Sequence, residues 1–264
     1  MLLGLCLVLF SGLSKALFTD VSAREIRPFV KIFGGDYAEE GEYPFMLSME
    51  QSGSHFCGAS AISDYWAITA AHCLVGTDPE ELSLRAGSLT QAKGGTLHQA
   101  VEIFIYPKYY TTQFDEDIAL VKVKNPFSEN DYVEYVKLPD QWEPLEVGSE
   151  AMVAGWGLTS MNWDAELSEK LKDVKIIVMN PEKCAENPQN RGSFLITDNM
   201  ICAAAEGEDT CPGDSGGPVV VKEGDHQKLV GLVSWGDGKG DLNNPGIYTR
   251  VSQYRLWIFM KTSV

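Results

Sequence analysis

A series of about a dozen short apolar or alternating runs constrains the fold of this chain more than any other feature. Each run is only as long as a typical strand, and Gly, Pro, Asn and Asp residues cluster between the runs. Many short strands separated by turn residues favour an all-β sandwich or barrel. We expect strands at residues 44–49, 55–62, 66–71, 82–86, 101–106, 118–123, 151–155, 174–179, 200–204, 218–222, 229–235 and 246–251.

Only the end of the chain has a helical pattern. Tyr254, Trp257, Ile258 and Lys261 recur at the spacing i, i+3, i+4, i+7, which places them on one side of a helix. Ser252 precedes them and is a suitable N-cap, because its hydroxyl can accept a hydrogen bond from a free backbone N–H. The sequence therefore predicts a single helix at the C-terminus.

The first residues have the pattern of an export signal. Residues 2–13 are apolar, which is too short for a membrane span but suits the apolar region of a signal peptide. The small residues Ser14 and Ala16 favour cleavage after Ala16, although no Lys or Arg precedes the apolar run. A buried N-terminal strand or helix is the alternative. We expect residues 1–16 to be a signal peptide and the protein to be secreted.

The charge balance argues against two classes of partner. The chain has 21 Lys and Arg residues against 37 Asp and Glu residues, a net charge of −16. Nucleic acids and anionic membrane surfaces bind clusters of basic residues, so neither is expected to bind this protein. No segment after the signal is long and apolar enough for a membrane span.

The cysteines point to disulfides with one left over. The chain has six cysteines, and loss of Cys6 with the signal peptide leaves five. This odd number in an oxidising compartment means that one thiol is unpaired or pairs outside the chain. The sequence lacks the Cys-x-x-Cys pairs that are typical of zinc sites.

Three short segments carry residues with catalytic potential: 69–73 contains His72, 115–120 contains Asp117, and 213–218 contains Ser215. Each segment alone has a structural explanation as a strand end or a tight turn. Together they supply a nucleophile, a base and a group that orients the base, which is the minimum set for acyl transfer.

The order and surroundings of these motifs identify a family. The chain resembles secreted serine proteases of the chymotrypsin/trypsin family, and is trypsin-like, over nearly all of residues 32–264. The three segments follow the family's His, Asp, Ser order. Four flanking motifs match as well: Ile32-Phe33-Gly34-Gly35, Gly155-Trp156-Gly157, Ser234-Trp235-Gly236 and Pro245-Gly246-Ile247-Tyr248.

The resemblance implies the fold. The family has an all-β architecture of two six-stranded antiparallel β-barrels packed face to face, with a C-terminal helix. The active site lies in the cleft between the barrels. His72 and Asp117 would come from the first barrel and Ser215 from the second, within a protease domain of residues 32–264.

The resemblance also implies a mechanism that needs no cofactor and no metal. His72 would take the proton of Ser215 during attack on the peptide carbonyl, while Asp117 fixes the imidazole tautomer. The backbone N–H groups of Gly213 and Ser215 would form the oxyanion hole.

Proteases of this family are made as zymogens, which assigns residues 17–31 to an activation propeptide. A second trypsin-like protease could cut after Lys31 and free the Ile32 α-ammonium group. That group would turn inward and pair with Asp214 beside the nucleophile. Phe33 stands where the family usually has a smaller aliphatic residue.

The expected specificity is for Arg and Lys. Asp209, six residues before Ser215, matches the base of the family's primary pocket. A buried carboxylate there would select a cationic side chain. Gly236 and Gly246 would leave room for it, and the segment from Ser234 through Trp235 to Gly236 would pair with the substrate backbone. An exposed Asp209 beside a neutral pocket is the alternative.

Two family disulfides are implied, Cys57–Cys73 and Cys184–Cys202. Cys211 is expected to be unpaired, because Lys239 occupies its usual partner position. The pocket wall there lacks a bridge. We expect Lys239 to point outward; the alternative is that it leans towards Asp209 and weakens selection for a cationic substrate.

Three other departures from the family pattern matter less. Ala151 and Val221 replace a further bridge, which predicts apolar packing between them. Pro212 stiffens the approach to Gly213. The loop at residues 87–98 has no carboxylate, so we expect no calcium there.

The implied partners are protein and peptide substrates, an activating protease and protein inhibitors, and a monomer is expected. Two alternatives remain at this point. One is a catalytically silent homologue that acts as a binding module. The other is an active protease with chymotryptic specificity.

Overall fold

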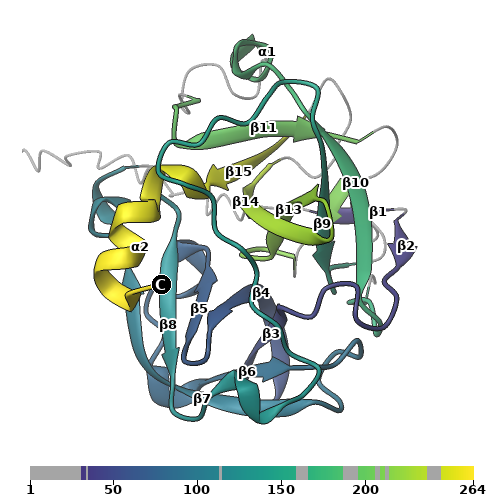
Figure 1. Ribbon diagram of the computed structural model, residues 1–264, viewed down its shortest axis with the longest axis vertical. Helices are drawn as coiled ribbons and strands as arrows, with labels where there is room; N and C mark the ends of the chain where they lie inside the picture. Colours follow the sequence, from purple (N-terminus) through teal and green to yellow (C-terminus); the bar gives the residue numbers. More distant parts are fainter. Residues whose placement is uncertain are drawn as a thin grey trace, which may run out of the picture.

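The computed structural model describes residues 31–33, 35–112, 115–158, 166–186, 196–205, 209–211, 214–236 and 245–264 (Figure 1). For residues 31–33, 129 and 209–211 the backbone alone is described. The expected signal peptide, propeptide residues 17–30, Pro212, Gly213 and Lys239 lie outside the described residues.

Six antiparallel strands close into a first barrel in the order β3-β4-β5-β8-β7-β6. Side chains alternate along β6, where Leu82, Leu84 and Ala86 are buried while Ser83 and Arg85 are partly exposed. This alternation gives the barrel an apolar interior. The strands are β3 (Met46–Gln51), β4 (Ser54–Ser63), β5 (Trp66–Thr69), β6 (Leu82–Ala86), β7 (Thr96–Ile105) and β8 (Ala119–Val123).

The second barrel has the order β11-β15-β14-β13-β9-β10, and pairing of β10 with β11 closes it. Its strands are β9 (Glu150–Gly155), β10 (Lys172–Val178), β11 (Met200–Ala204), β13 (Pro218–Glu223), β14 (His226–Trp235) and β15 (Gly246–Arg250). The expected pair of six-stranded antiparallel barrels is therefore confirmed, and every strand predicted from the sequence is present. Most ends shift by one to three residues, but β7 begins five residues before the expected residue 101.

Three short strands lie outside these rings. β2 (Asp36–Tyr37) pairs with the edge of β10. β1 (Lys31–Phe33) and β12 (Asp209–Cys211) form a separate antiparallel pair. The cleavage segment expected from the sequence is therefore paired with the strand that contains Asp209.

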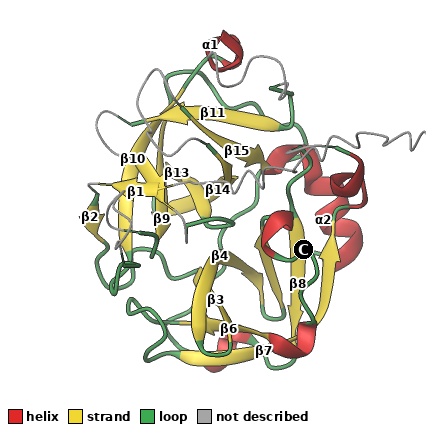
Figure 2. Ribbon diagram, turned by 180° about the vertical axis from the view of Figure 1, so that it is seen from behind, coloured by secondary structure: helices red, strands yellow, loops and turns green. Residues whose placement is uncertain are grey.

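The helices are short and lie on the outside of the barrels, as Figure 2 shows from behind. They are the 3₁₀ turns η1 (Ala71–Cys73), η2 (Pro79–Glu81), η3 (Pro107–Thr111), η4 (Phe127–Glu129) and η5 (Val251–Tyr254), and the α-helices α1 (Pro181–Glu186) and α2 (Arg255–Thr262). None of the helices in the described ranges is long and apolar enough to cross a membrane.

The C-terminal helix α2 follows the last strand of the second barrel and lies beside β8 of the first (Figure 1). Trp257 and Ile258 anchor it in the core. The predicted C-terminal helix is present, but the expectation of a single helix is wrong because α1 is a second one. The expectation that Ser252 caps α2 is also wrong. Because the turn η5 precedes α2, the N-cap position falls on Tyr254, which makes no side-chain cap bond.

Apolar packing holds the two barrels together, and each barrel contains one disulfide bond of its own. The core of the first barrel continues into the second through Val220, Leu229 and Leu232. Disulfide bonds join Cys57 to Cys73 and Cys184 to Cys202, the pairs that the resemblance implied. Ala151 and Val221 belong to the apolar cluster of the second barrel, so packing takes the place of a bridge there.

Candidate active site

His72 and Asp117 meet at one end of the first barrel. The turn η1 carries His72 directly after β5, and Asp117 directly precedes β8. Strands β5 and β8 pair with Thr69 opposite Ala119, which brings the two segments together. The distance from His72 Nδ1 to Asp117 Oδ2 is 2.7 Å, and the backbone N–H of His72 donates to Asp117 Oδ1 at 2.8 Å. This double contact fixes the imidazole relative to the carboxylate.

The second barrel also holds Asp117. The Ser234 hydroxyl donates to Asp117 Oδ2 at 2.6 Å, and the Thr249 hydroxyl donates to the Asp117 backbone oxygen at 2.8 Å. The sequence pointed to Ser234 only as part of an edge that pairs with substrate, and it gave no signal for Thr249. These two bonds tie the carboxylate to strands β14 and β15 across the junction of the barrels.

The electrostatics of the pair follow from burial and mutual contact. The His72 side chain is 19% exposed and the Asp117 side chain 5%. Burial works to raise the pKa of Asp117, but the charge of His72 and the hydrogen bonds from His72 and Ser234 outweigh it, so this pKa is lowered. Burial works to lower the pKa of His72, but the charge and hydrogen bond of Asp117 outweigh it and raise this pKa. Asp117 is therefore an anion at neutral pH, and His72 gains basicity from it.

Ser215 lies in the turn before β13 and is held against the first barrel. Its backbone oxygen accepts from the N–H of Gly58 at 2.8 Å. The residue before Gly58 is Cys57, whose disulfide reaches Cys73, the neighbour of His72. This short path connects the nucleophile's backbone to the histidine's turn.

Glycine at position 216 permits this approach. Gly216 has φ +75°, and a Cβ there would lie 2.1 Å from the Thr69 hydroxyl and 2.7 Å from the Gly58 oxygen. No side chain larger than hydrogen fits without moving the turn away from the first barrel. The second glycine of the motif therefore sets how closely the turn of Ser215 approaches Thr69 and Gly58 of the first barrel.

Asp214 is completely buried next to Ser215. One of its hydrogen bonds comes from the backbone N–H of Gly157 to Oδ1 at 2.8 Å. A Cβ on Gly155 would lie 1.9 Å from Oδ1, and one on Gly157 would lie 2.2 Å from Oδ2. The Gly155-Trp156-Gly157 motif thus lines the space around the Asp214 carboxylate. A side chain at Gly155 or Gly157 would overlap its oxygens.

The structure describes only part of the expected substrate pocket. Gly236 and Gly246 face each other, since a Cβ on Gly236 would lie 3.5 Å from the Gly246 Cα. A Cβ on Gly246 would lie 2.8 Å from the Tyr248 hydroxyl, so packing alone already requires glycine there. Trp235 is partly exposed beside Gly236. The Asp209 and Cys211 side chains are not described, and Gly213 of the expected oxyanion hole lies outside the described residues.

The backbone of the expected cleavage segment lies next to the pocket strand. In the β1–β12 pair, Lys31 is opposite Cys211, Ile32 is opposite Thr210, and Phe33 is opposite Asp209.

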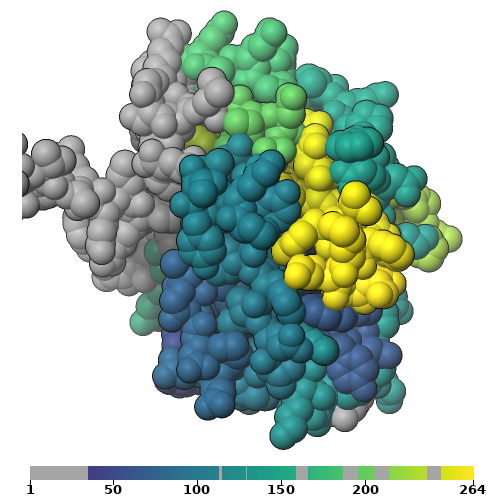
Figure 3. All heavy atoms as spheres, turned by 90° about the vertical axis from the view of Figure 1, so that its left-hand side faces the viewer, coloured from purple at the N-terminus to yellow at the C-terminus, as the bar shows by residue number. Residues whose placement is uncertain are grey.

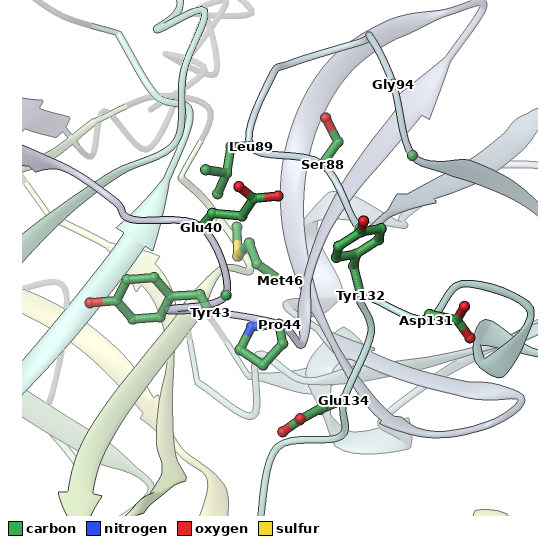
Figure 4. A pocket seen from close by; sticks show the side chains of 13 residues that line it. Glu40, Tyr43, Pro44, Met46, Ser88, Leu89, Gly94, Asp131, Tyr132 and Glu134 are labelled. Atoms are coloured by element: carbon green, nitrogen blue, oxygen red, sulfur yellow. The ribbon is translucent and has the colours of Figure 1, made fainter.

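A cavity of about 680 Å³ opens away from these residues (Figure 4). Glu40, Asp131 and Glu134 line it together with Tyr132 and Met46, and its lining includes none of the catalytic candidates. Its lining contains no histidine, and the hydroxyl of its serine, Ser88, is bonded to the backbone oxygens of Thr90 and Lys93, so we assign the cavity no part in the chemistry.

One group of potential metal ligands is found among the described residues: Cys57, His72 and Cys73, whose ligand atoms lie within 4.8 Å of one another. The two sulfur atoms are joined in a disulfide and cannot supply the thiolates that a metal binds. This cluster is therefore part of the disulfide-bonded turn that carries His72 and is not suited to a metal.

Comparison with known proteins identifies relatives over nearly the whole chain. The protein-family model described as Trypsin matches residues 32–258. A trypsin of Phaedon cochleariae is 38% identical over 245 residues, which cover 91% of this chain and 92% of that protein. Trypsin Blo t 3 of Blomia tropicalis is 37% identical over 231 residues, 86% of this chain and 84% of that protein. A tryptase of Mus musculus is 35% identical over 269 residues, 97% of this chain and 96% of that protein.

Proposed function

The chain belongs to the trypsin family and is a serine endopeptidase, and from this premise we propose that it is a secreted zymogen that cleaves after Arg and Lys. The proposed triad is Ser215, His72 and Asp117. The observation that carries the proposal is the His72–Asp117 contact, with Nδ1 2.7 Å from Oδ2 and both residues largely buried.

The roles follow from this geometry. Asp117 accepts the Nδ1 proton, so Nε2 of the neutral ring is left free to accept a proton from Ser215. Ser215 Oγ then attacks the carbonyl, and His72 returns the proton to the leaving amine. Negative charge on Asp117 stabilises the imidazolium ion that forms in between. Water repeats the sequence on the acyl-enzyme and releases the second product.

The oxyanion that forms needs donors close to Ser215. We assign this role to the backbone N–H groups of Ser215 and Gly213. Such donors act most strongly in a partly buried site, and Ser215 is only 7% exposed.

Activation by cleavage after Lys31 is part of the proposal. The new α-ammonium of Ile32 would form an ion pair with Asp214, whose carboxylate is fully buried beside Gly155 and Gly157. The pairing of β1 with β12 supports this, because it keeps Ile32 near the Asp209 strand before the cut. A buried pair of this kind biases the site towards one conformation.

Secretion rests on the signal-peptide pattern of residues 1–16 and on the two disulfides, which persist in oxidising compartments. The substrates are proteins or peptides, as the family implies. The proposed domain is residues 32–264, after removal of the signal peptide and the propeptide 17–31.

Matched Arg and Phe ester substrates test both parts of the proposal. After cleavage at Lys31, we expect strong preference for the Arg ester, abolished by Ser215→Ala and lost on Asp209→Ser. Preference for the Phe ester would leave a serine protease but overturn the Asp209 pocket. Absence of Ser215-dependent turnover in a folded, cleaved protein would favour the silent homologue. Glu182→Gln changes an exposed carboxylate on α1 and serves as the matched control.

A further inference from the structure

The C-terminal helix α2 is apolar on two opposite sides. One side carries Trp257 and Ile258, which are 8% and 0% exposed in the core. The other carries Leu256, Phe259 and Met260, which are 59%, 53% and 67% exposed. The spacing i, i+3, i+4 places these three side chains together on the outer side. An amphipathic surface helix normally has polar residues there, so this face has the composition of a contact surface.

An exposed tryptophan extends this face at the start of the helix. Trp142 is 72% exposed and has φ +60°, a conformation that bulky residues rarely adopt. Its backbone N–H donates to the Ser252 oxygen at 2.9 Å, and the neighbouring Gln141 bonds to Gln253 and to the Leu256 N–H. These bonds hold Trp142 beside α2 in spite of its strained backbone. Strain of this kind is retained where the exposed side chain has a use.

We call Trp142, Leu256, Phe259 and Met260 the helix patch. In Figure 3 the yellow C-terminal residues stand at the surface of the molecule, next to teal residues from the middle of the chain. Large apolar side chains exposed together on one face mark an interaction site.

The charges at the two ends of the patch have opposite sign. Asp140 is exposed at the start of α2, next to Gln141 and Trp142. Lys261 is exposed at the other end, with its ammonium group 5.0 Å from the centre of the Phe104 ring. The Arg255 guanidinium also reaches that end but is partly buried and donates to the Val264 oxygen at 2.7 Å, so Lys261 is the exposed cation there.

We propose that the helix patch binds the same patch of a second copy of this chain, with the two α2 helices antiparallel about a two-fold axis. Such an axis places each surface against itself in the reverse direction. Lys261 of one copy then faces Asp140 and Trp142 of the other, and the contact occurs twice. The patch is therefore complementary to itself in charge as well as in apolar character. The inference does not rest on the catalytic proposal, and it replaces the monomer that the family resemblance implied.

The dimer is expected to be weak and reversible, because the acidic chains repel each other and the patch is small. Sedimentation velocity over a series of concentrations measures it in the Ser215→Ala protein, which cannot digest itself. Met260→Lys should abolish association, since it puts a charge in the apolar patch and a second exposed cation beside Lys261. Tyr132→Lys, at a tyrosine 69% exposed in the cavity of Figure 4, is the matched control and should leave association unchanged.

A charge exchange tests the antiparallel arrangement. Lys261→Glu and Asp140→Lys should each weaken the dimer by about tenfold, since each puts like charges together twice. The double variant should restore it to near the original strength. All of these residues are exposed, so circular dichroism should report an unchanged fold.

Three results would overturn the inference. The protein could remain a monomer at every concentration, or form a dimer that none of these substitutions changes. It could also stay monomeric and bind phosphatidylcholine–phosphatidylserine vesicles in a flotation assay through Met260, which would make the patch a lipid surface.

Discussion

Replacing Asp117 with Asn tests whether this carboxylate sets the proton position on His72. Both of its oxygens accept hydrogen bonds. Oδ1 accepts from the His72 backbone N–H at 2.8 Å, while Oδ2 lies 2.7 Å from Nδ1 and accepts from the Ser234 hydroxyl at 2.6 Å. An asparagine has only one oxygen, so its NH₂ group must face one of these two sets of partners.

The position of the NH₂ group depends on which of its partners can change from donor to acceptor. A backbone N–H is always a donor, whereas an imidazole nitrogen and a hydroxyl can both accept. Opposing two buried donors costs about 1–3 kcal/mol, so the NH₂ group should take the Oδ2 position. Nδ1 then accepts, and the single proton of the neutral ring moves to Nε2, where Ser215 needs an acceptor. We expect kcat to fall by about 10⁴-fold, the size known for this change in proteases that use this mechanism.

The same substitution should move the pH profile. Burial alone lowers the pKa of His72, and the charge and hydrogen bond of Asp117 raise it above its ordinary value. Without the Asp117 charge, burial is the main influence on His72, so the pKa of His72 falls. Because the rate rises as His72 loses its proton, the acidic limb of kcat/KM should lie above about pH 6.5 in the original protein and below it in the variant.

Rates of Arg-ester hydrolysis between pH 5 and 10 measure both effects on protein cleaved after Lys31. The control is Glu182→Gln, which removes an exposed carboxylate on α1 and should change neither the rate nor the limb. The reasoning fails if Asp117→Asn keeps more than about a tenth of the original kcat. It also fails if the acidic limb of kcat/KM in this variant lies at higher pH than in the original protein.

Three further substitutions test the close approach at Gly216 and the contribution of two ion pairs to stability. Gly216→Ala puts a methyl group 2.1 Å from the Thr69 hydroxyl at φ +75°, so kcat should fall by about 10²-fold or more; an unchanged rate would contradict the close approach. Glu50→Gln leaves Arg85 without its buried partner at 2.6 Å and should lower the free energy of unfolding by about 3–5 kcal/mol in urea. Lys93→Ala breaks a pair whose side chains are both 71% exposed and should cost less than about 1 kcal/mol, and equal losses in the two variants would refute the distinction.

The strands were predictable because each one alternates or is apolar over its length and ends at turn residues. Ring closure was not predictable from these runs, since it depends on the long-range pairing of β10 with β11. The family resemblance supplied it. The N-cap expected at Ser252 failed because a 3₁₀ turn between β15 and α2 delays the helix by one turn, and the periodic pattern of Tyr254 and Trp257 does not distinguish the two.

The candidate site was predictable where a motif marks it and not elsewhere. His72, Asp117 and Ser215 stand in recognisable segments, and the glycines at 155 and 157 have a clear reason once Asp214 is seen between them. The bond from Thr249 to Asp117 joins residues more than a hundred positions apart and has no local signal. The apolar outer face of α2 was not predicted, because the sequence analysis considered only the side of the helix that carries Trp257 and Ile258.

A fluorophosphonate probe tests the central claim most directly, because it reacts only with a serine that an adjacent base activates. Mass spectrometry of the labelled peptides identifies the modified residue before and after cleavage at Lys31. We predict a single label on Ser215, strong in the cleaved protein, weak in the uncut chain, and absent from both the Ser215→Ala and the His72→Ala proteins. No label on Ser215 in a folded and cleaved protein, or a label that persists without His72, would contradict the proposed catalytic site.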